Sequence, residues 1–352
     1  MIIKPGLLAV VVVGLAVGVM AAKTAPWNWG TVSDEYASDP AVAKSKAICR
    51  KLGAPVIPAA DRPNAAEAAG LKDCNSEALY YGEGMTPDYV KARQCAILED
   101  EKGDDDVGFF AGKTILMQVY ANGLGVGRNI DLATALACSV EGAPAENDGR
   151  VLHIQALAAK PGTFDICDDI TSGYADGFCT SRASTLAGFA RDGKIDAVAK
   201  SFPAASAPLF AEVKKAFDTF ATAHAQGEVD LSGTSRAAFE IEAEDGERDQ
   251  FLKDLTRLAD GSWPQATQAD AAAADAGLNE RYRKGLDQCT ERADNYSTVR
   301  ADDVRTTQRA WLAYRDAYLK FTAVAAPGVT QDAVMARLTK LRMADLDALP
   351  CS

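Results

Sequence analysis

Two segments of this chain, about 40 residues apart, share one pattern that favours a repeated helical fold. They read YGEGMTPDYVKA over 81–92 and YANGLGVGRNIDLA over 120–133. Each runs from a tyrosine through a glycine-rich turn to an Asp or Asn, and then into alanine-containing helical sequence. Glycines supply the positive φ that a tight turn needs, and the Asp or Asn caps the second helix. The period predicts stacked helix–turn–helix units, a short α-solenoid.

The two segments resemble Sel-one-like repeats, which are relatives of the tetratricopeptide repeat. Each copy departs from that pattern, because Cys95 stands where an aromatic residue is usual and Leu132 where a lysine is usual. Stacks of this kind need at least three units, so we expect flanking helices and disulfides to complete a repeat domain over 40–150. Two roles stay open for this domain: a scaffold only, or a concave surface that binds another protein.

The N-terminus indicates export. One lysine, Lys4, precedes an uninterrupted apolar run over 7–20, and small residues follow at Ala21 and Ala22. This order is typical of a secretory signal peptide, here 1–22. The run is shorter than the roughly 20 apolar residues of a bilayer span. We expect a periplasmic or secreted protein without a further membrane segment; an uncleaved N-terminal anchor is the alternative.

Eight cysteines, an even number, all follow this segment. They include no CxxC pair that would indicate a zinc ribbon or a thioredoxin-like site. Four disulfides are expected in an oxidising compartment, although eight cysteines allow 105 pairings. Of the pairs that we expect, Cys95–Cys138 joins equivalent helices of two repeats, and Cys289–Cys351 joins the first and last helices of a C-terminal domain. The expected pairs are Cys49–Cys74, Cys95–Cys138, Cys167–Cys179 and Cys289–Cys351.

The region 151–274 is predicted to form a long helical hairpin that connects the repeats to that C-terminal domain. Apolar residues at helical spacing over 209–224 indicate an amphipathic helix, and 232–259 indicates another with acidic residues dense on one side. The run 266–277 reads as a linker or a weak helix. Four aspartates near Cys167 lack the spacing of a calcium-binding EF-hand loop, so no metal is expected there. They are Asp165, Asp168, Asp169 and Asp176.

Near the end of the chain, LNERY over 278–282 is followed by QRAWLAYRD over 308–316. Trp311, Arg315 and Tyr318 recur at spacings of four and three, which places them on one face of a helix. Apolar stripes predict three helices in this part, with a break at 326–328 between the second and the third.

This pair of motifs resembles the LprI-type lysozyme inhibitor family, a small helical domain of exported bacterial proteins, over 275–352. The family commonly has a cysteine just after YRD, where this chain has Tyr318 and Leu319, so a bond between Cys289 and Cys351 takes over its role. The resemblance implies a protein that blocks a muramidase. An inhibitor of that kind places basic or hydrogen-bonding groups in a cleft that holds catalytic carboxylates. The candidate binding residues are Arg309, Trp311, Tyr314, Arg315 and Asp316; the alternative is that they form the domain's core and its internal ion pairs.

Charge and motifs exclude several classes of function. The net charge of −12 argues against nucleic acid as a partner. Residues 275–352 hold 12 basic and 11 acidic side chains, so the acidity lies upstream, where it favours solubility or attracts a cationic partner such as a lysozyme. No HExxH, GxSxG or phosphate-binding glycine loop occurs, and His153 and His224 have no partner motif.

These observations predict an all-α, disulfide-bonded protein that binds another protein and is not an enzyme. No metal ion or cofactor is expected. The expected partner is a protein such as a lysozyme, with no nucleic acid and no membrane beyond the signal segment. The alternative function is a periplasmic scaffold whose helical repeats recruit other proteins.

Overall fold

The computed structural model describes residues 27–33, 38–103, 109–291 and 297–351. The predicted signal peptide, 1–22, lies outside this range. Within it no strand occurs, which confirms the all-α class, and no helix is both long and apolar enough to cross a bilayer. The described ranges contain thirteen α-helices: α1 (Ala43–Leu52), α2 (Ala65–Gly70), α3 (Ser76–Tyr81), α4 (Tyr89–Lys102), α5 (Lys113–Asn122), α6 (Ile130–Ala137), α7 (Pro144–Ala156), α8 (Gly173–Ala199), α9 (Ala207–Gly227), α10 (Arg236–Asp260), α11 (Gln268–Glu291), α12 (Ala301–Ala325) and α13 (Gln331–Asp347).

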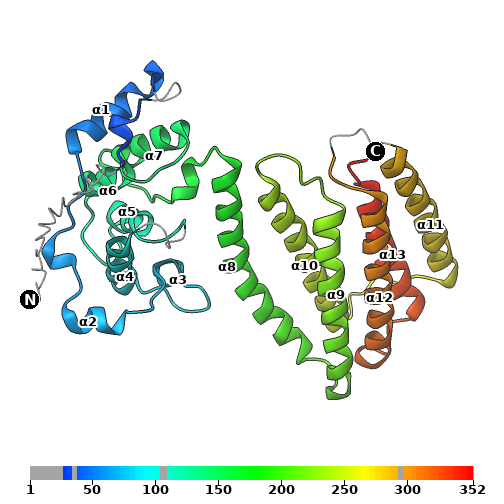
Figure 1. Cartoon of the computed structure of the whole chain (residues 1–352). Helices are drawn as coiled ribbons and strands as arrows, with labels where there is room; N and C mark the ends of the chain where they lie inside the picture. The colour runs from blue at the N-terminus through cyan, green and yellow to red at the C-terminus, as the bar shows by residue number, and fades with distance from the viewer. Residues whose placement is uncertain (1–26, 34–37, 104–108, 292–296, 352) are drawn as a thin grey trace, which may run out of the picture.

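The helices pack around two hydrophobic cores. One group, α1–α7, lies on one side of the molecule, α9–α13 lie on the other, and α8 runs between them (Figure 1). The first core extends along the chain from Trp29 to Cys179 and the second from Ile195 to Cys351. The long helix α8 contributes to both, since Cys179 lies near its start and Ile195 near its end.

The two predicted glycine-rich turns have the same backbone structure. Gly82 ends α3 and Gly123 ends α5, and both adopt the left-handed conformation. Six residues later, Asp88 and Asn129 cap the next helices, each with its side chain accepting from a backbone N–H three residues on. The helix–turn–helix pairs α3–α4 and α5–α6 are therefore repeats in structure. Their relation to the Sel-one-like family stays a prediction.

Close stacking of the two units depends on Gly125. A Cβ atom at this position would lie 2.7 Å from the backbone carbonyl carbon of Tyr89, at the start of the preceding unit's second helix. Its φ of 67° also disfavours any residue with a side chain. We therefore attribute the second glycine of this turn to packing between repeats.

The four disulfides pair Cys49 with Cys138, Cys74 with Cys95, Cys167 with Cys179 and Cys289 with Cys351. The last two pairs confirm the sequence predictions, whereas Cys49–Cys74 and Cys95–Cys138 were wrong. Stacked helices keep their axes about 8–10 Å apart, but the Cα atoms of a disulfide lie about 4.4–6.8 Å apart, so equivalent repeat positions are poorly placed for a bond. Instead, Cys49–Cys138 joins α1 to the end of α6. Bonds across an oxidised fold of this kind are typical of exported proteins.

The helices expected over 209–224 and 232–259 are present as α9 and α10. The run 266–277 is largely the first part of α11, so the predicted domain start at residue 275 falls inside a continuous helix. Among the described helices, the most extensive pairing joins α9 to α12. The C-terminal core therefore includes side chains from α9 and α10 as well as from α11–α13.

Candidate functional site

Helix α12, which carries the QRAWLAYRD motif, turns one face into the C-terminal core and the other to solvent. Val304, Trp311 and Tyr318 are buried on the inner face. Arg309, Leu312 and Asp316 are exposed at spacings of three and four residues, so they share the opposite face. The motif thus combines a core stripe with a surface stripe.

Two of the five candidate binding residues lie in the core. Trp311 is 2% exposed and Tyr314 is 5% exposed. The Tyr314 ring stacks on Phe220 of α9, with centroids 5.8 Å apart and 3° between the ring planes. Burial raises the pKa of the Tyr314 phenol well above its usual value of 10. Both rings are buried, and α9 packs against Tyr314, so the charged members of the set are left as candidate contacts.

These charged side chains and one apolar neighbour form the α12 outer face, which we define as Arg309, Leu312, Arg315 and Asp316. The Arg315 guanidinium lies over the Trp311 ring, 5.3 Å from its centroid, and donates two hydrogen bonds to Oδ1 of Asp316, at 3.0 and 2.8 Å. The buried tryptophan therefore supports an ion pair on the surface.

Arg309 differs from Arg315 in its hydrogen-bond partner, which is a hydroxyl group. Its Nη2 donates to the Thr306 hydroxyl at 3.1 Å, and within the described part of the chain no carboxylate pairs with it. Leu312, three residues on, is 36% exposed. The α12 outer face therefore offers an uncompensated cation beside an apolar side chain.

Gln308, the first residue of the motif, takes part in a buried ionic network beneath this face. Nε of Arg342, on α13, donates to Oε1 of Gln308 at 2.9 Å. The two Nη atoms of Arg342 donate to the carboxylate of Glu228 at 2.6 and 2.5 Å, and neither side chain of this pair is exposed. Glu228 directly follows α9, so the network joins α9, α12 and α13.

Three further titratable groups surround this ion pair. The Nδ1 atom of His224 lies 3.0 Å from Glu228, its Nε2 lies 3.7 Å from Glu247, and Asp345 lies 3.6 Å from Arg342. Burial tends to lower the pKa of His224, but the hydrogen bond to Glu228 and the nearby carboxylates outweigh it and raise that pKa. Burial, followed by repulsion from Asp345, raises the pKa of Glu247 to about 7.

The sequence did not predict this network. His224 has no partner motif, and Glu228, Arg342 and Asp345 had no predicted role. The only signal available was the presence of charged side chains at positions where helical periodicity places the core. Arg342 and Glu228 are 114 residues apart in the sequence, so no local sequence pattern links them.

We expect Glu247 to make the stability of the C-terminal core pH-dependent. Its folded pKa of about 7 exceeds the ordinary 4.5, so the stability contribution of the protonated acid is complete below pH 4.5 and is lost as pH rises toward 7. Glu247→Gln keeps this position neutral. The substitution should therefore raise the free energy of unfolding at pH 8, by on the order of 2 kcal/mol, and change it little at pH 4.5.

Urea unfolding followed by the fluorescence of Trp263 and Trp311, which both lie in this core, would measure the effect. Glu242→Gln, on the exposed side of α10, is the matched control and should leave the pH profile unchanged. A Glu247→Gln protein with the parent's slope between pH 5 and 7 would show that Glu247 does not titrate in this range.

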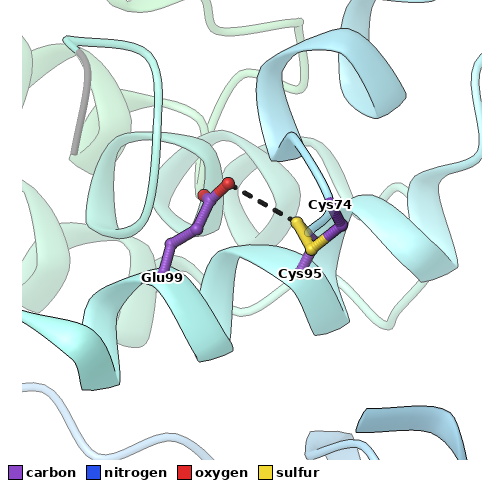
Figure 2. Close-up of side chains that lie close together, drawn as sticks. All are labelled: Cys74, Cys95 and Glu99. Atoms are coloured by element: carbon purple, nitrogen blue, oxygen red, sulfur yellow. Dashed lines mark hydrogen bonds between the residues drawn. A yellow bond between two sulfur atoms is a disulfide. The ribbon is translucent and has the colours of Figure 1, made fainter. Parts of the chain in front are cut away.

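A cluster of residue types that can bind metals lies beside the first core, where Cys74, Cys95 and Glu99 come together (Figure 2). Both sulfurs belong to one disulfide, and the Sγ of Cys95 lies 3.5 Å from a carboxylate oxygen of Glu99. Glu99 accepts hydrogen bonds from the backbone N–H groups of Ser76 and Gly112, each at 3.0 Å. Because the sulfurs are bonded to each other and the carboxylate is engaged by the backbone, this cluster joins α3, α4 and α5 rather than forming a metal site.

Comparison with known proteins agrees with the geometry of the C-terminal part. The family model described as lysozyme inhibitor LprI matches residues 260–346, from the last residue of α10 almost to the end of α13. This match confirms the resemblance predicted from the LNERY and QRAWLAYRD motifs. No curated protein and no solved structure matches the chain with statistical significance. The C-terminal part is thus lysozyme-inhibitor-like.

Proposed function

We propose that this chain is an exported envelope protein that binds a lysozyme through the α12 outer face and so protects peptidoglycan. The observation that carries the proposal is the LprI match over a domain whose motif helix presents an uncompensated arginine. Lysozyme-type glycosidases cut with a pair of carboxyl groups in an open cleft. A guanidinium is suited to such a target, because it remains charged and can donate two parallel hydrogen bonds to one carboxylate.

In this proposal Arg309 enters the cleft and Leu312 packs against its wall. Trp311 supports Arg315 from below and so positions this surface. The Trp311 ring itself is buried and does not contact the partner. The ion pair of Arg315 with Asp316 fixes the polar edge of the contact. Binding blocks the substrate cleft, so the chain itself needs no catalytic group.

Charge outside the domain supports the encounter with the partner. The chain outside 275–352 has 25 basic and 38 acidic side chains, so a cationic lysozyme would be attracted to the molecule as a whole. Attraction of this kind raises the association rate and weakens with added salt. The four disulfides are consistent with a periplasmic or secreted location.

Arg309→Glu should weaken lysozyme binding about 30-fold or more, because it replaces the cation at the proposed contact with a group that the partner's carboxylates repel. Isothermal titration of the oxidised chain, lacking 1–22, against lysozymes of several classes would measure the change. Arg283→Glu makes the same charge change at an exposed position of α11 and should bind as the parent does. Equal affinities of the two variants would place the contact elsewhere on the molecule.

A further inference from the structure

A separate pocket lies at the edge of the first core, between α7, the turn Ile166–Asp169 and the start of α8. Its volume is about 350 Å³, and we call it the α7–α8 pocket. Ala143, Ile166 and Ile170 give it apolar walls, and Phe109 and Tyr174 line it as well. None of its lining residues belongs to the C-terminal core or to the α12 outer face.

An aromatic wall borders this pocket. Tyr174 is 71% exposed, and its ring centroid lies 5.0 Å from that of Phe178. Phe178 in turn stacks on Phe109, with 5.0 Å between centroids and 8° between planes. An aromatic side chain held this far out of the core contributes little to folding, and grouped exposed rings commonly mark a binding surface.

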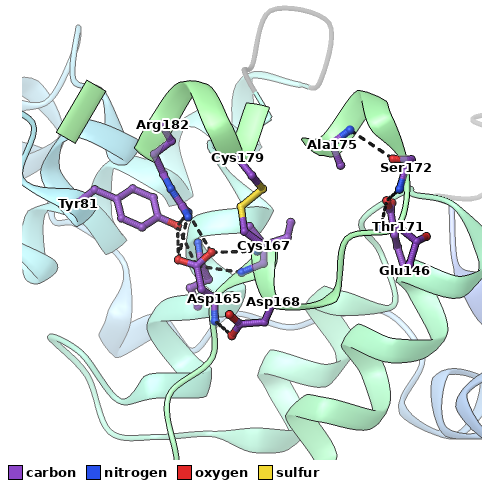
Figure 3. The surroundings of a disulfide bond; sticks show 12 residues. Tyr81, Glu146, Asp165, Cys167, Asp168, Thr171, Ser172, Ala175, Cys179 and Arg182 are labelled. Atoms are coloured by element: carbon purple, nitrogen blue, oxygen red, sulfur yellow. Dashed lines mark hydrogen bonds and ion pairs between the residues drawn. A yellow bond between two sulfur atoms is a disulfide. The ribbon is translucent and has the colours of Figure 1, made fainter. Parts of the chain in front are cut away.

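The floor of the pocket is polar and fixed. The carboxylate of Glu146 accepts from the backbone N–H groups of Ala143, Thr171 and Ser172; the bonds to Thr171 and Ser172 are drawn in Figure 3. Next to it lies Arg150, which is 4% exposed and donates through Nη2 to the Val140 carbonyl at 2.6 Å. Among the described residues, no group accepts a hydrogen bond from its Nε.

Gly142 keeps this floor open. A Cβ atom at residue 142 would lie 3.1 Å from Oε2 of Glu146 and 3.7 Å from Nη1 of Arg150. A larger side chain there would therefore pack against both polar groups of the floor. The glycine has no positive φ that would explain its presence.

The charges select for a neutral ligand. Among the described residues, three carboxylates and one guanidinium line the pocket, and this balance disfavours an anion; the carboxylates are Glu141, Glu146 and Asp169. The Arg150 guanidinium disfavours a cation at the floor: burial lowers its pKa only to about 10, so it remains charged at neutral pH. The ligand must therefore be uncharged, carry both hydrogen-bond donors and acceptors, and present an apolar face to the aromatic wall.

We propose that the α7–α8 pocket binds an N-acetylated amino sugar. The C–H face of a pyranose ring packs on Tyr174, and the sugar hydroxyls donate to Glu141. The acetamido oxygen accepts from Arg150, and its methyl group contacts Ile166 and Ile170. This inference does not depend on lysozyme binding, because the two sites share no residue.

The test is a titration of the oxidised chain, lacking 1–22, with the tetramer of N-acetylglucosamine, followed by calorimetry and by amide shifts of residues 171–175. Saturable binding with a Kd below about 1 mM is expected. Tyr174→Ala should weaken it about tenfold, because an exposed ring is removed without disturbing the core. Phe189→Ala, an exposed aromatic four turns along α8, is the control and should bind as the parent does.

Maltotetraose, which lacks acetamido groups, should bind much more weakly than the amino-sugar tetramer. Sedimentation of the chain with purified peptidoglycan tests whether the ligand is an amino sugar of the cell wall or a free amino sugar. The proposal is overturned if the tetramer shows no saturable binding at about 10 mM, if Phe189→Ala weakens binding as much as Tyr174→Ala does, or if arginine amide competes for the pocket.

Discussion

Residues 275–352, expressed alone and oxidised, are expected not to form a stable fold. The cut divides α11 after its first two turns and removes α9, which makes the most extensive contact with α12. Without α9, Tyr314 loses its stacking partner Phe220, and Trp311 and Tyr318 lose part of their cover. Exposure of several large apolar side chains exceeds the few kcal/mol that a small domain has in reserve.

Circular dichroism during urea unfolding would measure this. The 275–352 fragment should lack a cooperative transition, whereas 173–352, which keeps α8–α13 intact, should show one. The fragment pair therefore tests whether the functional folding unit begins before the LprI match. A cooperative transition of 275–352 with the helix content of α11–α13 would contradict the prediction.

The second large effect is expected for Arg342→Met, which should lower the free energy of unfolding by about 3–5 kcal/mol. The substitution leaves Glu228 buried without its bidentate partner, and it also removes the hydrogen bond to Gln308. The loss of stability comes mainly from the uncompensated charge of Glu228, because methionine fills most of the volume of the arginine side chain.

Replacement of both partners separates charge from packing. Arg342→Met combined with Glu228→Leu should recover a substantial part of the loss, since a buried pair can often be exchanged for apolar residues at little cost. Lys340→Met, an exposed cation on the same helix, is the control and should change stability by less than about 0.5 kcal/mol. If the double variant is as unstable as Arg342→Met, the defect lies in packing and the charge argument is wrong.

Local sequence was sufficient for the elements whose physics is local. Glycine-rich turns followed by Asp88 and Asn129 predicted the two repeat units, because positive φ and helix caps act within a few residues. The pairing of Cys167 with Cys179 followed from a short chain segment, and that of Cys289 with Cys351 from helix ends.

Tertiary packing decided the rest. The bond between Cys49 and Cys138 depends on where α1 packs, and no sequence pattern near either cysteine indicates the position of that helix. Periodicity showed that α12 has two faces, but only the position of α9 determined that Tyr314 lies on the buried one. Arg309 could be predicted as a candidate contact. That no carboxylate of the described residues pairs with it could be seen only from the packing of the neighbouring helices.

The central claim, inhibition of a lysozyme by this chain, is tested most directly by a lysis assay. Peptidoglycan turbidity is followed while the oxidised chain, lacking 1–22, is titrated into lysozymes of several classes. We expect the activity of at least one class to fall in proportion to added protein and to vanish near one equivalent, with Arg309→Glu shifting the curve to higher ratios. Undiminished lysis in every class at a large molar excess would contradict the proposal and would favour a scaffold role for the helical repeats.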